Sequence, residues 1–123
     1  MNQTELIEHA KKARLLAKAE YSNYQVGAAL LCDNGEVIYG CNVESKAYPT
    51  TMCAERVAIF SAISQGLTKF KSIAVVTKDG ATPCGGCRQV MFEYAGDIPV
   101  FISDLEGNQS KIQLLELLPH PFF

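Results

Sequence analysis

The sequence predicts an α/β fold, a three-layer α/β/α sandwich around a mixed sheet of about five strands. Helical and extended patterns alternate along the chain, and an early tight-turn signal separates two apolar runs. The later strands are short and continuously apolar, which is typical of strands that are buried. With 123 residues, 48% of them hydrophobic, the chain has the size and composition of one globular domain, residues 1–123.

Each element rests on its own local pattern. Apolar residues at helical spacing predict a first helix, which Asn2 or Thr4 can cap. A hairpin follows, because Asn-Gly at residues 34–35 readily adopts the positive φ angles of a tight turn. In chain order, the expected elements are a helix at 3–20, strands at about 25–32 and 36–42, a helix at 53–66, a strand at 72–77, a helix at 85–96, a strand at 99–104 and a short helix at 112–118.

Composition excludes several classes of function. The N-terminal segment is charged and amphipathic, and no stretch approaches the roughly 20 apolar residues of a membrane span, so we expect a cytoplasmic protein with no membrane contact. The net charge is −2 and the basic residues are scattered, so no nucleic-acid partner is expected. Disulfides are rare in the cytosol, and five cysteines cannot all pair within one chain.

The segment PCGGC carries two cysteines just after a predicted strand, where open α/β sheets place their sites. Cys84 and Cys87 open one helix, and Cys53 lies at the start of the preceding helix. Three cysteines at two helix N-termini can converge on one point, and helix N-termini lower thiolate pKa values, which makes the cysteines better metal ligands. Zn²⁺ suits thiolates, and with one Zn²⁺ per chain the three ligands leave its fourth tetrahedral position for water. Glu55, two residues after Cys53, is placed to move protons without ligating the metal.

Other interpretations of the cysteines stay open at this point. Cys84 and Cys87 have the spacing of a thioredoxin-like redox pair, although no aromatic residue precedes them. A structural four-cysteine zinc site needs Cys32 or Cys41, whose spacing within a hairpin is not a zinc pattern, so both are expected to be small buried hydrophobes. Taken alone, Arg88 is expected to form a surface ion pair.

Motifs at four separated places resemble the cytidine deaminase family, specifically its short-chain type that forms homotetramers. In chain order they are YSNYQVGAAL, GCNVE, CAER with PCGGCRQ, and LLPHPF. The resemblance extends over nearly the whole chain. It implies a cytidine deaminase-like fold and zinc-dependent hydrolytic deamination of cytidine and 2′-deoxycytidine to uridine and 2′-deoxyuridine plus ammonia, a reaction of pyrimidine salvage.

The same resemblance implies a role for each site residue. Glu55 is the catalytic proton shuttle, and Arg56 offsets the charge of the ligand thiolates. Asn42 and Glu44 bind ribose hydroxyls, and Phe122 reaches the site of a neighbouring subunit. The implied zinc ligands are Cys53, Cys84 and Cys87. The implied substrate-binding residues are Tyr24, Asn42, Glu44, Ala54 and Phe122.

The chain departs from the family beside the implied ribose site. Ser45 and Lys46 replace the Asn and Ala that relatives commonly carry, and Tyr24 replaces a Phe. The bulk and charge of Lys46 put the nucleoside preference in question, so a modified cytosine nucleoside such as blasticidin S is the alternative substrate. From another class, the chain fits a catalytically silent, zinc-stabilised binding module, although such a module has no need of Glu55.

Overall fold

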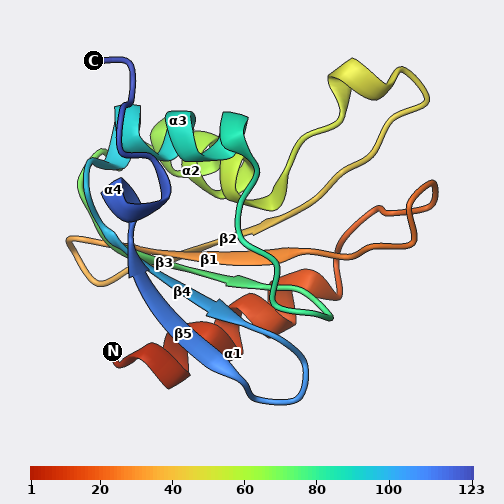
Figure 1. Ribbon diagram of the computed structural model, residues 1–123, viewed down its shortest axis with the longest axis horizontal. Helices are drawn as coiled ribbons and strands as arrows, with labels where there is room; N and C mark the ends of the chain where they lie inside the picture. Colours follow the sequence, from red (N-terminus) through yellow and green to blue (C-terminus); the bar gives the residue numbers. More distant parts are fainter.

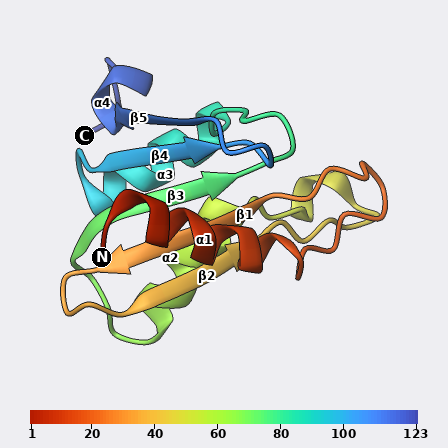
Figure 2. The same cartoon turned by 90° about the horizontal axis from the view of Figure 1, so that it is seen from below.

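The structure is a computed structural model that describes all residues 1–123. Its elements are α1 (Gln3–Arg14), β1 (Gly27–Cys32), β2 (Val37–Cys41), a 3-10 helix (Tyr48–Thr50), α2 (Ala54–Ser64), β3 (Phe70–Val76), α3 (Gly85–Ala95), β4 (Pro99–Ser103), β5 (Gln109–Gln113) and α4 (Leu114–Leu117). The strands form one mixed sheet in the order β2-β1-β3-β4-β5. Figures 1 and 2 show α1 on one face of the sheet and α2 and α3 on the other, which confirms the predicted three-layer sandwich.

Strand pairing explains why the sheet is mixed. β1 pairs antiparallel with both β2 and β3, β3 pairs parallel with β4, and β4 pairs antiparallel with β5. Because side chains alternate along a strand, the central strands fill two separate cores. Leu30 and Ile73 belong to the core under α2 and α3, whereas Ala29 and Ala74 belong to the core under α1.

The first helix is shorter than the helical spacing predicts, because it ends at Arg14 instead of residue 20. Beyond that point Lys18 forms an isolated parallel bridge with Val43, just after β2 ends. Its N–H donates to the Asn42 carbonyl at 2.9 Å, and its own carbonyl accepts from the Glu44 N–H at 2.9 Å. The segment therefore lies beside the residues that follow β2, and these tertiary hydrogen bonds override the local helical pattern.

The fifth strand, β5, was not located from the sequence, and the short helix α4 begins at Leu114 rather than residue 112. The strand reads Gln-Ser-Lys-Ile-Gln and lies mostly exposed at the edge of the sheet. Since apolar side chains are almost absent, neither alternation nor a continuous apolar run marks it. Pairing with β4 gives it its strand conformation.

Gly40 lets α2 lie directly on β2. A Cβ atom at this position would sit 2.1 Å from the Ala54 carbonyl oxygen and 2.8 Å from the Ala58 Cβ, so no side chain fits between helix and strand. This contact fixes the first turn of α2, where Cys53 and Glu55 lie.

None of the helices combines the length and the apolar character needed to cross a membrane.

Candidate active site

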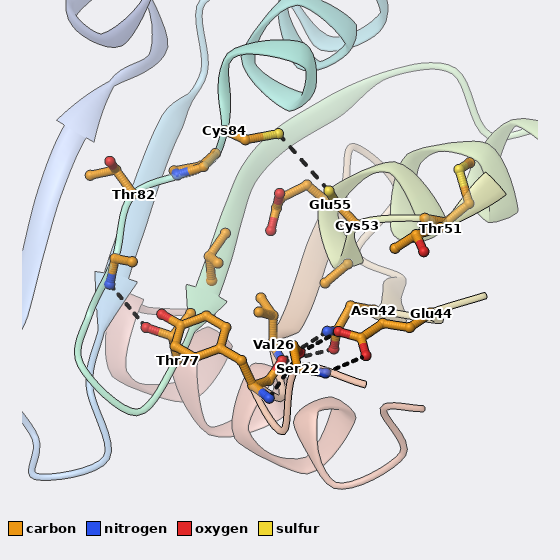
Figure 3. Close-up of a pocket in the computed structure, with 16 residues that line it drawn as sticks. Ser22, Val26, Asn42, Glu44, Thr51, Cys53, Glu55, Thr77, Thr82 and Cys84 are labelled. Atoms are coloured by element: carbon orange, nitrogen blue, oxygen red, sulfur yellow. Dashed lines mark hydrogen bonds between the residues drawn. The ribbon is translucent and has the colours of Figure 1, made fainter. Parts of the chain in front are cut away.

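A cavity of about 480 Å³ opens where β2 and β3 end and α2 and α3 begin. Figure 3 shows two groups of side chains in it. Cys53, Cys84 and Glu55 lie together at one end, and Ser22, Asn42 and Glu44 lie together at the other. We call these the cysteine end, which includes Cys87, and the polar end. The lining residues are Ser22, Tyr24, Val26, Asn42, Glu44, Thr51, Met52, Cys53, Ala54, Glu55, Val75, Thr77, Ala81, Thr82, Pro83 and Cys84.

The three predicted zinc ligands converge at the cysteine end. Cys53 is the N-cap residue of α2, Cys84 is the N-cap residue of α3, and Cys87 lies in the first turn of α3. The Sγ atom of Cys84 lies 3.9 Å from that of Cys53 and 3.3 Å from that of Cys87, and all three lie within 4.8 Å of one another. Sulfurs at Zn–S distances of about 2.3 Å in a tetrahedron are roughly 3.8 Å apart, so this donor set fits Zn²⁺.

Arg56 supplies positive charge beside these sulfurs. Its Nη2 donates to the Cys53 Sγ at 3.3 Å, and its buried Nε has no hydrogen-bond partner. The hydrogen bond to Cys53 raises the pKa of Arg56 above its usual value, although burial opposes the shift. Three thiolates around one Zn²⁺ leave a net negative charge, which the guanidinium can balance. The positive charge of Arg56 therefore suits a cluster of three thiolates that ligate one Zn²⁺.

Without a metal, the thiols share protons unequally. The pKa of Cys53 falls to about 5, because the Cys87 thiol and Arg56 donate hydrogen bonds to it and outweigh the effect of burial. The pKa of Cys87 rises, because it donates that hydrogen bond to Cys53 and because it is buried. Zinc binding would therefore displace protons from the cluster, since ligating thiols must be deprotonated.

Glu55 is almost completely enclosed, with 3% of its surface exposed. Burial raises its pKa to about 7, a rise that the nearby Cys53 thiolate increases and a hydrogen bond with Cys87 partly opposes. A carboxyl group with a pKa near neutral can both accept and release a proton. The cysteine end therefore combines a metal-binding cluster with a group suited to proton transfer.

At the polar end, Asn42 and Glu44 hold the segment that precedes β1. The Asn42 amide accepts from the Val26 N–H at 2.9 Å and donates to the Tyr24 carbonyl at 2.8 Å. Glu44 accepts from the Tyr21 and Ser22 N–H groups, each at 3.0 Å, and from the Ser22 hydroxyl. These hydrogen bonds, the one from the Ser22 hydroxyl above all, lower the pKa of Glu44 and keep it charged.

The remaining predicted substrate-binding residues differ in position. Tyr24 and the fully buried Ala54 line the cavity. Phe122 does not line the cavity of its own chain, and 84% of its surface is exposed. Of the departures from the family, Ser45 accepts from the Ala47 N–H at 3.3 Å, and Lys46 is exposed and outside the cavity lining.

The other two cysteines do not join the cluster. Cys32 is buried in the core under α2 and α3, as expected, whereas Cys41 is only half-buried in β2. All five cysteines are free thiols. Arg88 corrects an expectation, because it forms no ion pair and donates to main-chain carbonyls.

Two structural contributions of the lining were not anticipated from the sequence. Ser22 holds Glu44, although it was noted only as part of a family segment. Tyr24 donates its hydroxyl to Asp79, which also accepts from the Thr77 hydroxyl at 3.2 Å. Asp79 lies in a loop without any repeating pattern, so no signal in a single sequence pairs it with Tyr24.

Comparison with known proteins gives a consistent result. A family model for the cytidine and deoxycytidylate deaminase zinc-binding region matches residues 1–102. The cytidine deaminase of Sporosarcina psychrophila is 45% identical over 125 residues, which cover 99% of this chain and 92% of that protein. The blasticidin-S deaminase of Bacillus cereus is 33% identical over 125 residues, which cover 94% of this chain and 88% of that protein.

The likeness extends to the three-dimensional structure. The crystal structure of cytidine deaminase from Burkholderia pseudomallei superposes with a TM-score of 0.96 and 43% sequence identity, covering 99% of this chain and 100% of that one. The family match extends over residues 1–102 and therefore includes all three clustered cysteines. The chain belongs to the cytidine and deoxycytidylate deaminase family.

Proposed function

We propose that this protein catalyses the zinc-dependent hydrolytic deamination of cytidine and 2′-deoxycytidine, giving uridine and 2′-deoxyuridine plus ammonia. The observation that carries the proposal is the buried Glu55 carboxylate beside the three-cysteine cluster, in a cavity whose opposite end carries Asn42 and Glu44. The cavity volume of about 480 Å³ lies within the range of small-molecule sites. The relatives named above, most of them cytidine deaminases, support the substrate class.

Glu55 performs the proton transfers. When bound by Cys53, Cys84 and Cys87, Zn²⁺ supplies the Lewis acidity that makes water a nucleophile near neutral pH. The Glu55 carboxylate takes a proton from the attacking water and delivers it to N3 of the cytosine ring, which makes C4 electrophilic. Glu55 then takes the proton of the new C4 hydroxyl and passes it to the amine, so that C4=O forms as the C4–N bond breaks and ammonia leaves. A single carboxyl group thus acts as base and as acid.

The polar end recognises the sugar. The Asn42 amide can both donate and accept, and the charged Glu44 carboxylate accepts from sugar hydroxyls. A site that hydrogen-bonds a hydroxyl discriminates against analogues that lack it, because its own polar groups are then left unpaired. Free cytosine is therefore a poor substrate, and the carboxylate of Glu44 disfavours a 5′-phosphate.

The proposal is tested by ammonia release from the zinc-loaded protein with cytosine, cytidine, 2′-deoxycytidine, cytidine monophosphate and blasticidin S. The expected order places both free nucleosides above cytosine and the monophosphate. A preference for blasticidin S would mean that this compound, and not cytidine, is the substrate, in line with the Bacillus cereus relative. A matched Lys46→Ala variant shows whether that exposed lysine influences the preference. Absence of turnover with every compound would contradict the proposal and favour the alternative, a catalytically silent, zinc-stabilised binding module.

We further propose that residues 1–123 act as one domain, in the cytoplasm, within a homotetramer whose sites use residues from more than one subunit. The support for the assembly is apolar surface. Phe60 on α2 and Tyr94 on α3 are exposed and in edge-to-face contact, and Phe122 and Phe123 extend from the C-terminus. Sedimentation velocity measurements test the assembly, and a fully active monomer would contradict it.

A further inference from the structure

Two residues that directly follow the predicted zinc ligand Cys87 bind other segments of the chain. The first is Arg88, whose guanidinium donates three hydrogen bonds. Nε donates to the Pro83 carbonyl at 2.7 Å and Nη2 donates to the Thr82 hydroxyl at 3.0 Å, just before Cys84. Nη1 donates to the carbonyl of Leu117, the last residue of α4, at 2.8 Å. One side chain thus joins the loop of one zinc ligand to the C-terminal part of the chain.

The second residue, Gln89, binds the main chain of Phe122 at two points. Its Nε2 donates to the Phe122 carbonyl at 3.1 Å, and its Oε1 accepts from the Phe122 N–H at 3.0 Å. Both hydrogen-bonding groups of one amide side chain are used on one residue. The neighbouring Phe123 ring also contacts Phe92 of α3 edge to face, with centroids 5.6 Å apart.

These contacts order Phe122 without burying it. Its main chain is held at two points, yet 84% of its surface is exposed. Ordering one residue costs about 1 to 2 kcal/mol, and burial of the Phe122 ring does not offset this cost within one chain. The hydrogen bonds therefore hold an aromatic side chain in a defined outward position, with its main chain fixed to the helix that carries Cys87.

We propose that Arg88 and Gln89 are positioning residues. Arg88 fixes the Cys84 loop to the end of α4, and Gln89 fixes Phe122 for contact with the substrate site of a second copy of the chain. The Gln89 half of this inference rests on the proposed function and assembly. The Arg88 half concerns how the cysteine cluster is held.

Gln89→Met removes both hydrogen bonds to Phe122 and keeps the length of the side chain. Two observables should change: the Phe122 amide should exchange its hydrogen about 5- to 10-fold faster, and KM should rise by a similar factor with kcat within about twofold. Gln89→Glu should be intermediate, because it keeps the acceptor for the Phe122 N–H and loses the donor. Gln65→Met is the matched control, since the Gln65 side chain bonds only to Ser61 of α2.

Arg88→Lys keeps the charge but cannot reproduce the three-point fork. Zinc transfer to a chelating dye should become about 10-fold faster, because the support of the Cys84 loop is weakened. The control is Arg14→Lys, which disturbs a single side-chain bond from α1, on the other face of the sheet, to the Gln25 carbonyl. Its zinc transfer should match that of the wild type.

Unchanged Phe122 exchange and unchanged KM in Gln89→Met would overturn the role of Gln89. Equal zinc transfer in Arg88→Lys and wild type would overturn the role of Arg88. Failure of the proposed function is distinguishable, because it would appear as a wild-type protein without turnover, whereas amide exchange and zinc transfer need no substrate. If Gln89→Met speeds exchange but leaves KM unchanged, Gln89 orders the tail only and the positioning of Phe122 for substrate is wrong.

Discussion

The two ends of the cavity are built in different ways. At the cysteine end, every group lies at the start of a helix, and α2 is pressed onto β2 at Gly40. At the polar end, Ser22, Asn42 and Glu44 lie in or beside irregular segments and are held by hydrogen bonds between side chains and main chain. Close packing of α2 on β2 positions the first group, whereas hydrogen bonds position the second, and water can partly replace those of Glu44.

This difference has consequences for what each end can tolerate. A change at the cysteine end disturbs a charge-balanced cluster that includes the buried Cys87 and Glu55, so it should affect chemistry, metal binding and stability. A change at Glu44 removes contacts near solvent, so it should affect substrate binding with little effect on the fold. The predictions below test this division, starting from the largest expected effect.

Glu55→Gln should give the largest loss. The amide keeps the size of the buried side chain but cannot shuttle a proton, so turnover of cytidine should fall by at least about 10²- to 10⁴-fold. Zinc content should stay at one ion per chain, because the three residues placed to ligate the metal are cysteines and Glu55 is not one of the ligands. Steady-state kinetics combined with metal analysis of the same sample checks this. Near-normal turnover would mean that another group moves the proton.

The cysteine end could be predicted largely from the sequence. Short-range signals place Cys53 and Cys84 at helix starts, and helix starts after successive strands tend to meet at one edge of a sheet. The packing that brings α2 against β2 was not predictable, because nothing in a single sequence shows that Gly40 faces Ala54. Arg56 was expected near the thiolates only through the family resemblance.

The polar end was harder to predict from the sequence. Asn42 and Glu44 were assigned by resemblance, and their bonds to Ser22 and Val26 connect segments about 20 residues apart through irregular backbone. Those contacts depend on where α1 ends, which helical spacing misplaced. The edge strand β5 was missed for a related reason, because its conformation depends on pairing rather than on apolar pattern. Long-range polar contacts leave no periodic signal.

Gly40→Ala tests whether packing positions the cysteine end. The added Cβ would meet the Ala54 carbonyl oxygen at 2.1 Å, so the first turn of α2 must move away from β2. The free energy of unfolding should fall by about 3 kcal/mol, and zinc affinity should fall with it. Urea unfolding and chelator competition measure the two effects. Gly86→Ala is the control, because nothing lies within 4 Å of the added atom. Equal behaviour of the two variants would contradict the packing argument.

The burial of Glu55 should appear as a pH dependence in the metal-free protein. Its pKa is about 7 in the folded state against 4.5 ordinarily, so the folded protein binds this proton more tightly than the unfolded chain. The resulting stability is fully present below pH 4.5 and is lost as the pH rises through about 7. The stability of the wild type relative to Glu55→Gln should therefore fall by about 2 kcal/mol between about pH 5 and 8.

Unfolding of both proteins in urea, with chelator and reductant, measures that difference. The lowered pKa of Cys53 acts in the opposite sense, since it makes stability rise with pH above about 5. This contribution is present in both proteins and largely cancels in the comparison. A stability difference that does not change with pH would show that Glu55 titrates as an exposed carboxyl group.

Glu44→Gln should have the smallest effect, and that effect should be limited to substrate binding. The amide can still accept from the Tyr21 and Ser22 N–H groups, so the free energy of unfolding should change by less than about 1 kcal/mol. The loss of a charged acceptor for a sugar hydroxyl should raise KM for cytidine about 10-fold, with kcat nearly unchanged. Measuring 3′-deoxycytidine as well sharpens the test. If Glu44 accepts from the 3′-hydroxyl, the wild type and the variant should have similar KM values for this nucleoside, which lacks that group. Glu36→Gln is the matched control, since Glu36 is exposed and bonds to Asn34 in the hairpin turn. A fall in kcat as large as the rise in KM would mean that the polar end also aligns the base for chemistry, and the division between the two ends would not hold.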